Sequence, residues 1–190
     1  MAKDLEINIA EADLVFFDTE TTGFDLKKEI IEIGLVKAKA KTFEVIEECD
    51  IKIKPERLED ADQDSLGIVG YDPEEWARDG VDLKTGLEKF LSYTDGVILV
   101  GHNIAFDWMH VRKALEQCGL SPNYYYKGLD TFSLGWQKLA GKPELSHVSL
   151  LELTKYFGLE QGRAHRAIDD ARTTYKVFLK LLKEPENRTF

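Results

Sequence analysis

The sequence has little cysteine, no long apolar run and no excess of positive charge, and each shortage excludes a class of protein. Its two cysteines, Cys49 and Cys118, have no C-x-x-C spacing, which excludes a disulfide framework and a cysteine-based zinc site. No apolar stretch approaches the roughly 18 residues of a membrane span, and residues 1–6 lack the apolar core of a signal peptide. The sequence therefore predicts a soluble cytoplasmic protein without a membrane partner.

The charge is negative overall and unevenly distributed. A net charge of −10 argues against a protein that coats nucleic acid by neutralising phosphates alone. Residues 1–126 hold 14 basic and 27 acidic side chains, whereas residues 127–190 hold 11 and 8. The basic side chains of the second part either form a patch for an anionic substrate or are scattered over the surface. They include Lys138, Lys142, Lys155, Arg163, Arg166 and Arg172.

The order of apolar runs predicts the fold class. A chain of 190 residues with 43% hydrophobic content is long enough for one domain and too short for two. Strand-like runs at residues 14–17, 30–36 and 45–53, joined by turns, predict an antiparallel meander. Shorter runs at residues 97–100 and 129–131 alternate with helices. We expect a single α/β domain with a mixed five-stranded sheet flanked by helices, a core from about 14 to 183 and a polar tail at 184–190.

Capping signals mark where the helices begin and end. Asp72 followed by Pro73 predicts a helix start, as does the capping-box spacing of Ser149 and Glu152, with Gly158 as the stop. Apolar stripes predict further helices after residue 83, at 105–118, from 131 to 137 and from 167 to about 183. Residues 56–64 are acidic and predict a solvated loop.

Two carboxylates follow the first apolar run on the same side. Asp18 and Glu20 are two residues apart directly after residues 14–17, so on a strand they face the same way. Like charges beside apolar surface are costly unless a cation lies between them, and a hard divalent ion with oxygen ligands fits that position. The alternative is an ordinary turn at the end of a strand.

Two helices each place an aspartate where an apolar residue is expected. Asp170 falls on the stripe of the last helix that we expect to include Ala167, Ala171, Tyr175, Phe178, Leu181 and Leu182, whereas Asp169 faces the other way. Asp107 heads the stripe of the helix at residues 105–118. A buried carboxylate needs a cationic partner, so Asp170 pairs with a metal ion or with Arg166 or Arg172, and Asp107 is either a ligand or a first-turn acid.

The four carboxylates together favour a metal centre, because independent caps need not converge and metal ligands must. Asp18, Glu20, Asp107 and Asp170 would suit two Mg²⁺ or Mn²⁺ ions about 4 Å apart, the arrangement that cleaves phosphodiesters. His165, five residues before Asp170, would act as the base that takes a proton from water. By contrast, His110 inside a helix is expected to be structural, His147 to lie in a loop, and His102 to bind substrate or to bond locally.

These residues resemble a known family. Residues 18–23 (DTETTG), 102–107 (HNIAFD) and 165–170 (HRAIDD) are similar to the three motifs of the DEDDh 3′-to-5′ exonucleases, which include proofreading epsilon subunits and ribonuclease T. Residues 30–34 (IIEIG) resemble the second strand of that family. The resemblance covers residues 14–182. Many members carry a His-Gly-Ile segment before the helix after the third strand, where this chain has residues 66–71 (LGIVGY).

The resemblance implies a ribonuclease H-like fold and a function. Asp18, Glu20, Asp107 and Asp170 would be metal ligands and His165 the general base. Contacts to the terminal nucleotide would come from Thr21, Thr22, Gly23, His102, Asn103 and Phe106. The expected activity is release of nucleoside 5′-monophosphates from single-stranded 3′ ends of DNA or RNA, with two Mg²⁺ or Mn²⁺ ions. The alternatives are a proofreading subunit or domain in a DNA polymerase assembly, and a non-catalytic nucleic-acid-binding domain.

Overall fold

The computed structural model describes residues 7–160 and 162–185 of the chain, and the predicted mixed sheet is confirmed in it. The strands lie in the order β3-β2-β1-β4-β5. Neighbours β1, β2 and β3 pair antiparallel, whereas β4 pairs parallel with β1, and β5 with β4. The strands are β1 (Leu14–Thr21), β2 (Ile30–Ala38), β3 (Val45–Lys52), β4 (Ile98–Gly101) and β5 (Leu129–Asp130).

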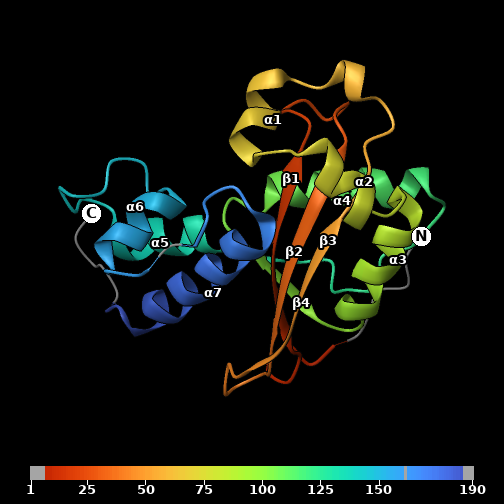
Figure 1. Cartoon of the computed structure of the whole chain (residues 1–190). Helices are drawn as coiled ribbons and strands as arrows, with labels where there is room; N and C mark the ends of the chain where they lie inside the picture. The colour runs from red at the N-terminus through yellow and green to blue at the C-terminus, as the bar shows by residue number, and fades with distance from the viewer. Residues whose placement is uncertain (1–6, 161, 186–190) are drawn as a thin grey trace.

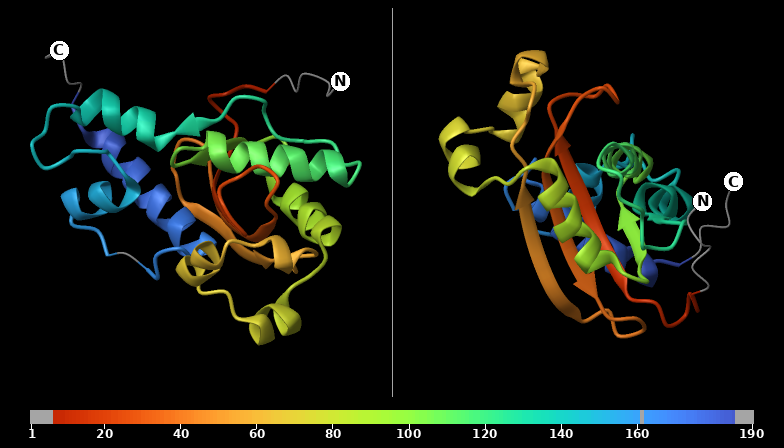
Figure 2. Two further views of the ribbon diagram at one scale, coloured as in Figure 1. Left: turned by 90° about the horizontal axis from the view of Figure 1, so that it is seen from above. Right: turned by 90° about the vertical axis from the view of Figure 1, so that its right-hand side faces the viewer.

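Helices cover both faces of the sheet (Figures 1 and 2). α3 (Leu83–Thr94) and α4 (Ala105–Gln117) lie on one face, and α7 (Ala167–Lys183) lies on the other. Two further helices, α5 (Thr131–Leu139) and α6 (Leu150–Tyr156), pack beside α7. A 3-10 turn (Leu58–Asp60), α1 (Gln63–Val69) and α2 (Pro73–Asp79) connect β3 to α3 at the upper end of the sheet in Figure 1.

The alternation of side chains along β1 feeds two cores. Val15 and Phe17 belong to the cluster under α3 and α4, whereas Leu14 and Phe16 belong to the cluster under α7. All four side chains are buried, because the strand lies in the middle of the sheet with helices on both sides. The strand is therefore held firmly up to the point where its acidic residues begin.

The predicted capping signals are present in the structure. The Asp72 side chain accepts a hydrogen bond from the Glu74 N–H at the start of α2. Ser149 and Glu152 form the reciprocal capping box of α6, which ends at a Phe157 cap before Gly158 at φ 60°. These local signals placed the helix ends correctly because they depend on neighbouring residues alone.

Three elements differ from the sequence prediction. β1 continues through Asp18 and Glu20, which lie within the strand and not after it. Residues 63–69 form α1 where a loop was predicted to run to 64; its buried Leu66 and Val69 form a stripe too short to detect. In α7, Leu182 is 44% exposed, because each residue advances about 100° round a helix and Leu181 already occupies the core face.

Some predictions concern residues that lie outside this description. The start of the chain at residues 1–6 and most of the predicted polar tail, residues 186–190, belong to that part. Across residues 7–160 and 162–185, each helix is too short or too polar to cross a lipid bilayer.

Candidate active site

The acidic pair of β1 faces the start of α7. Asp18 and Glu20 continue the alternation of Leu14 and Phe16, so they project from the sheet face that α7 covers. In the antiparallel pairing with β2, Asp18 lies opposite Gly34 and Glu20 lies opposite Glu32. The strand that forms the core thus presents two carboxylates to the first turn of α7.

Asp107 is attached to β1 at the end of the parallel pairing. The register of β1 with β4 ends at Phe16 and Val100, which leaves the Thr19 N–H without a strand partner. The Asp107 Oδ1 atom accepts this N–H at 2.8 Å and the Thr19 hydroxyl at 2.7 Å. Asp107 lies in the first turn of α4, so it is a first-turn acid whose carboxylate is also bonded to Thr19 of β1.

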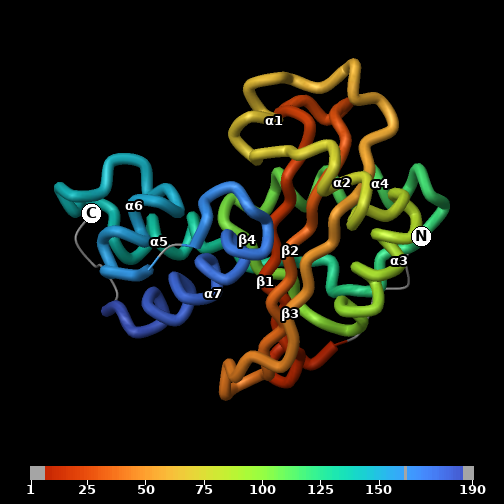
Figure 3. The backbone as a smooth tube through the Cα atoms, in the orientation of Figure 1, coloured from red at the N-terminus to blue at the C-terminus, as the bar shows by residue number. Residues whose placement is uncertain are grey.

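Asp170 and His165 are linked through the backbone at the start of α7. Asp170 is 8% exposed, and its Oδ2 accepts the His165 N–H at 2.9 Å. The His165 side chain is exposed, and the residue has a φ of 62°, a left-handed conformation that is uncommon for residues other than glycine. The segment that leads into α7 lies beside the sheet (Figure 3), and His165 lines a cleft together with Asp18 and Glu20 of β1.

One cleft brings the five predicted catalytic residues together. It has a volume of about 570 Å³ and lies between β1, the start of α4, the start of α6 and the start of α7. It is lined by Asp18, Thr19, Glu20, Phe24, His102, Asn103, Phe106, Asp107, Ser149, Leu150, Leu151, Ala164, His165 and Asp170. Four carboxylates and the His165 imidazole therefore converge from three distant parts of the chain.

The carboxylates repel one another in this cleft. Burial, with repulsion from Asp170, raises the pKa of Glu20 to about 8. Burial also raises the pKa of Asp107 to about 7, against the two hydrogen bonds from Thr19. The pKa of Asp18 is well above its usual range for the same reasons, burial first and Asp107 next. The cluster holds an excess of negative charge that a cation would neutralise.

The ligand atoms are spaced for a metal ion. Among the described residues, one donor atom each from Glu20, His165 and Asp170 lie within 4.8 Å of one another. Asp18 and Asp107 line the same cleft but lie outside this closest group. Carboxylate oxygens suit a hard divalent cation, so the donor set fits the ion expected from the sequence.

The arginines that were alternatives for Asp170 pair with other acids. Arg166 binds Glu32 at 3.0 Å, and Arg172 binds Glu48 at 2.6 Å and Asp169 at 3.0 Å. An ion pair with either arginine is therefore the wrong account of Asp170. Arg166 and Arg172 are likewise occupied by acids, which removes them from the predicted anion-binding patch.

Of the predicted substrate residues in the DTETTG segment, two line a cavity and the third is buried in the β1–β2 loop. Thr21 and Gly23 line a second cavity of about 350 Å³ next to the cleft. Glycine is favoured at position 23 by its φ of 154°, a conformation that residues with a Cβ atom rarely adopt, and a Cβ atom would also displace the Asp62 side chain. Thr22 is buried, and its hydroxyl accepts the Glu29 N–H at 3.0 Å, so its side chain holds the β1–β2 loop.

The residues after β4 lie at the opposite wall. The Thr131 hydroxyl donates to the Gly101 carbonyl at 3.2 Å, so His102 Nδ1 donates to Thr131 Oγ1 at 3.0 Å and Nε2 is left as an acceptor. Burial lowers the pKa of His102, which favours the neutral ring. The Asn103 N–H donates to Asp130 at 2.8 Å. His110 is fully buried with its ring 4.6 Å from that of Phe106, as a structural histidine would be.

Comparison with known proteins agrees with this geometry. The exonuclease family (RNase_T) matches residues 15–178. The chain belongs to the exonuclease family. Because its motifs are those of the DEDDh branch, it is a member of the DEDDh 3′-to-5′ exonuclease superfamily.

Relatives of this exonuclease chain occur as parts of larger proteins and as separate subunits. It is 32% identical to DNA polymerase III PolC-type of Caldanaerobacter subterraneus subsp. tengcongensis, over 92% of this chain and 12% of that protein. It is 29% identical to the DNA polymerase III subunit epsilon of Aquifex aeolicus, over 93% of this chain and 84% of that protein. The chain thus spans about an eighth of the length of the PolC-type relatives.

The fold of the exonuclease domain matches solved structures. The zinc-bound form of an Escherichia coli exonuclease I complex with single-stranded DNA superposes with a TM-score of 0.78 at 20% identity, covering 91% of this chain and 40% of that one. This likeness, together with the strand order, confirms the predicted ribonuclease H-like fold.

Sequence reasoning missed several residues of the exonuclease cleft. Phe24 is 82% exposed, with its ring 6.2 Å from that of Phe106 at the border of both cavities. Ser65 and Ile68 of α1 line the second cavity, and Leu151 of α6 lines the main cleft. An aromatic residue directly after Gly23 was a detectable signal, whereas nothing local to α1 or α6 indicates that they reach this site.

Proposed function

We propose that the chain is a metal-dependent 3′-to-5′ exonuclease that releases nucleoside 5′-monophosphates from single-stranded 3′ ends of DNA or RNA. The observation that carries this proposal is the cleft in which four carboxylates meet His165 in a chain of the exonuclease family. Carboxylates with raised pKa values are poised to bind a cation, and an exposed imidazole beside them is accessible to water.

Asp18, Glu20, Asp107 and Asp170 would hold two Mg²⁺ or Mn²⁺ ions. When bound, such ions supply Lewis-acid stabilisation of the charge that develops on the scissile phosphate. Their binding is supported by the convergence of oxygen donors and by the excess of negative charge. Thr19 would keep Asp107 in its orientation through its two hydrogen bonds.

His165 would act as the general base of the hydrolysis. A water oxygen attacks the terminal phosphorus, and the bond from phosphorus to the 3′ oxygen of the preceding nucleotide breaks. The water proton passes to the His165 ring, and the departing 3′ oxygen takes a proton from solvent. The products are a nucleoside 5′-monophosphate and a strand one nucleotide shorter with a free 3′ hydroxyl.

The walls of the cleft would hold the terminal nucleotide. Phe106 offers an apolar surface to a base, and the backbone at Thr21 and Gly23 borders the adjoining cavity. His102 Nε2 would accept a hydrogen bond from a sugar hydroxyl. Asn103 lies beside it in the same wall.

A role in proofreading is a second candidate. It is favoured by the similarity to DNA polymerase III PolC-type and to a subunit epsilon, the latter over 84% of its length. Under this proposal the partner is a DNA polymerase assembly and the substrate a mismatched primer end. Rates on matched single-stranded DNA, on RNA and on mismatched primer ends distinguish it from a general exonuclease. The cytoplasmic location stays a prediction.

The first test is digestion of a 5′-labelled single-stranded oligonucleotide with Mn²⁺. The wild-type protein should produce a ladder that shortens from the 3′ end, with 5′-monophosphates as the released product. Asp18→Ala and Asp170→Asn should abolish digestion and keep the circular dichroism spectrum of the fold, since each removes a ligand carboxylate.

The matched control is Asp169→Asn. It removes the neighbouring carboxylate, which pairs with Arg172 and is not among the cleft-lining residues, and it should retain digestion. Full digestion by Asp18→Ala or Asp170→Asn contradicts the catalytic assignment. Absence of Mn²⁺ binding to the wild type in calorimetry would favour instead a non-catalytic nucleic-acid-binding domain.

A further inference from the structure

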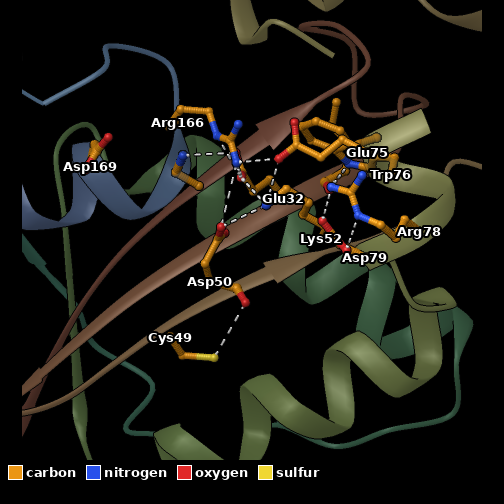
Figure 4. Close-up of polar contacts among 12 residues, drawn as sticks. Glu32, Cys49, Asp50, Lys52, Glu75, Trp76, Arg78, Asp79, Arg166 and Asp169 are labelled. Atoms are coloured by element: carbon orange, nitrogen blue, oxygen red, sulfur yellow. Dashed lines mark hydrogen bonds and ion pairs between the residues drawn. The ribbon is translucent and has the colours of Figure 1, made fainter. Parts of the chain in front are cut away.

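A group of buried and half-buried charges joins the start of α7 to β2 (Figure 4), and its member Glu32 lies opposite Glu20 in the β1–β2 pairing. We call it the β2–α7 ion-pair cluster. It consists of Glu32 of β2, Asp50 and Lys52 of β3, Glu75 of α2, and Arg166 directly before α7. None of these residues lines the cleft of about 570 Å³, but the charges of Glu32 and Arg166 affect the pKa of Glu20, so the cluster acts on the site through charge as well as through the backbone.

Glu32 is the centre of the cluster and contacts two consecutive residues at the start of α7. Its Oε1 atom accepts from Arg166 Nε at 3.1 Å and lies 3.0 Å from Arg166 Nη2. Its Oε2 atom accepts the Ala167 N–H at 3.2 Å, one of the N–H groups that a helix leaves unpaired at its start. One carboxylate therefore fixes both a side chain and the backbone of the first helical residue.

Because the cluster is buried, Glu32 and Arg166 must stay in contact with each other. The Glu32 side chain is 0% exposed and that of Arg166 is 12% exposed. Trp76 covers the pair, with its ring centroid 5.5 Å from Arg166 Cζ and its Nε1 donating to the Ile31 carbonyl at 2.8 Å. Buried charges must keep their partners, so displacement of Arg166 from Glu32 is strongly opposed.

Gly34, two residues further along the same face of β2, allows α7 to approach. A Cβ atom at Gly34 would lie 2.1 Å from the carbonyl carbon of Ala167 and 2.2 Å from the nitrogen of Ile168. These are backbone atoms, which cannot move aside as the end of a flexible side chain can. The first turn of α7 thus rests directly on the backbone of β2, opposite Asp18.

The attachment continues into the proposed catalytic residues. His165 precedes Arg166, adopts a φ of 62°, and donates its N–H to Asp170 at 2.9 Å. A histidine persists in this strained conformation only where its surroundings determine it. Glu32 holds residues 166 and 167 on one side, and Asp170 holds residue 165 on the other.

We propose that Glu32 and Gly34 are positioning residues that dock the first turn of α7 and so place His165 and Asp170 for catalysis. Neither touches substrate or the reacting atoms. The proposal deepens and rests on the proposed exonuclease function. A misplacement of about 1 Å in such a group costs on the order of 100-fold in rate, so the docking controls turnover.

The test compares Glu32→Gln with Glu48→Gln. Both glutamates lie on the sheet and pair with an arginine of the α7 region, but Glu48 binds Arg172, which is six residues further along the chain than the Arg166 bound by Glu32. In Glu32→Gln, we expect kcat to fall at least tenfold with KM within threefold of the wild type. Amide hydrogen exchange at His165 and Ala167 in the metal-free protein should become at least tenfold faster. Glu48→Gln should stay within twofold in all three measurements.

The readouts separate this proposal from the exonuclease assignment. If the wild type fails to digest oligonucleotides, the proposed function is wrong. The amide exchange rates of the metal-free variants then still show whether Glu32 holds the first turn of α7 on β2. Wild-type exchange at His165 and Ala167 in Glu32→Gln overturns the positioning role, as does an unchanged kcat in an active enzyme.

Two further variants keep the test decisive if Glu32→Gln does not fold. The double variant Glu32→Gln with Arg166→Gln replaces the ion pair by two amides and leaves neither charge unpaired, and it should show the same faster exchange. Gly34→Ala should displace the first turn of α7 sterically and reproduce the kcat loss with the cluster charges intact. Wild-type exchange and turnover in these variants overturn the proposal.

Discussion

His165 combines an exposed ring with a strained backbone, so its replacement must be chosen with care. Alanine at φ 62° costs about 1 kcal/mol relative to residues that tolerate the left-handed region, whereas asparagine tolerates it. A loss of activity in His165→Ala therefore mixes the missing imidazole with a disturbed turn. Asparagine removes the base and preserves the turn.

His165→Asn should lower kcat by about 100-fold or more, because general-base catalysis contributes on that order. Its Mn²⁺ dissociation constant, measured by calorimetry, should remain within threefold of the wild type. Glu20→Gln provides the comparison and should weaken Mn²⁺ binding, since it removes a ligand oxygen. If His165→Asn weakens Mn²⁺ binding as much as Glu20→Gln does, His165 is a metal ligand, in line with its place in the closest donor group.

At the scale of elements, the short helix α6 both lines the cleft and packs against α7, and its cap residue Ser149 stabilises it. Its start at Ser149, Leu150 and Leu151 lines the cleft, and its buried Leu153 packs in the cluster that includes α7 residues. The capping box of Ser149 with Glu152 fixes this short helix, which is too short to be stable alone. The shape of one wall of the cleft thus depends on a helix cap.

Ser149→Ala should lower the free energy of unfolding by about 1 kcal/mol and raise KM for the oligonucleotide more than it lowers kcat. The Asp82→Ala variant is the control, because Asp82 caps α3 through the Thr85 N–H at 3.0 Å, away from the cleft. It should lower the melting temperature and leave KM unchanged. An unchanged KM in Ser149→Ala would show that the start of α6 does not shape substrate binding.

For the whole molecule, the acidic cleft makes stability depend on pH and on metal ions. The pKa of Glu20 is raised to about 8 and that of Asp107 to about 7 in the folded state. A carboxyl with a raised folded-state pKa stabilises the protein at low pH, and this contribution is lost as pH rises through that pKa. His110, whose pKa is lowered to about 4, acts in the other direction only below about pH 6.5, where the unfolded histidine titrates.

Between about pH 6.5 and 8, the melting temperature of the metal-free protein should therefore fall as pH rises. Saturating Mn²⁺ should raise the melting temperature most at the high end of this range, because it binds the ionised carboxylates. Scanning calorimetry with EDTA and with Mn²⁺ measures both effects. In Glu20→Gln, the melting temperature should fall less over this pH range. A melting temperature of the wild type that rises with pH in EDTA would contradict the raised pKa values.

Local patterns determined most of the fold and the identity of the acidic residues. Alternation along β1 indicated that Asp18 and Glu20 face the same way, and the helical period separated Asp170 from Asp169. The cap of α6 was equally local. Such patterns are decided within a few residues by backbone geometry, so a single sequence contains them.

Long-range contacts decided the rest. The attachment of Asp107 to Thr19 across 88 residues and the docking of α7 on Glu32 across 135 residues follow from how elements pack. Packing also decided that α6 lines the main cleft, that α1 lines the second cavity, and that the Thr22 side chain is buried in the β1–β2 loop. The sequence by itself determined which side chains carry charge and on which face of an element they lie. Only the tertiary structure decided which of those charges meet, because packing and burial depend on the whole chain.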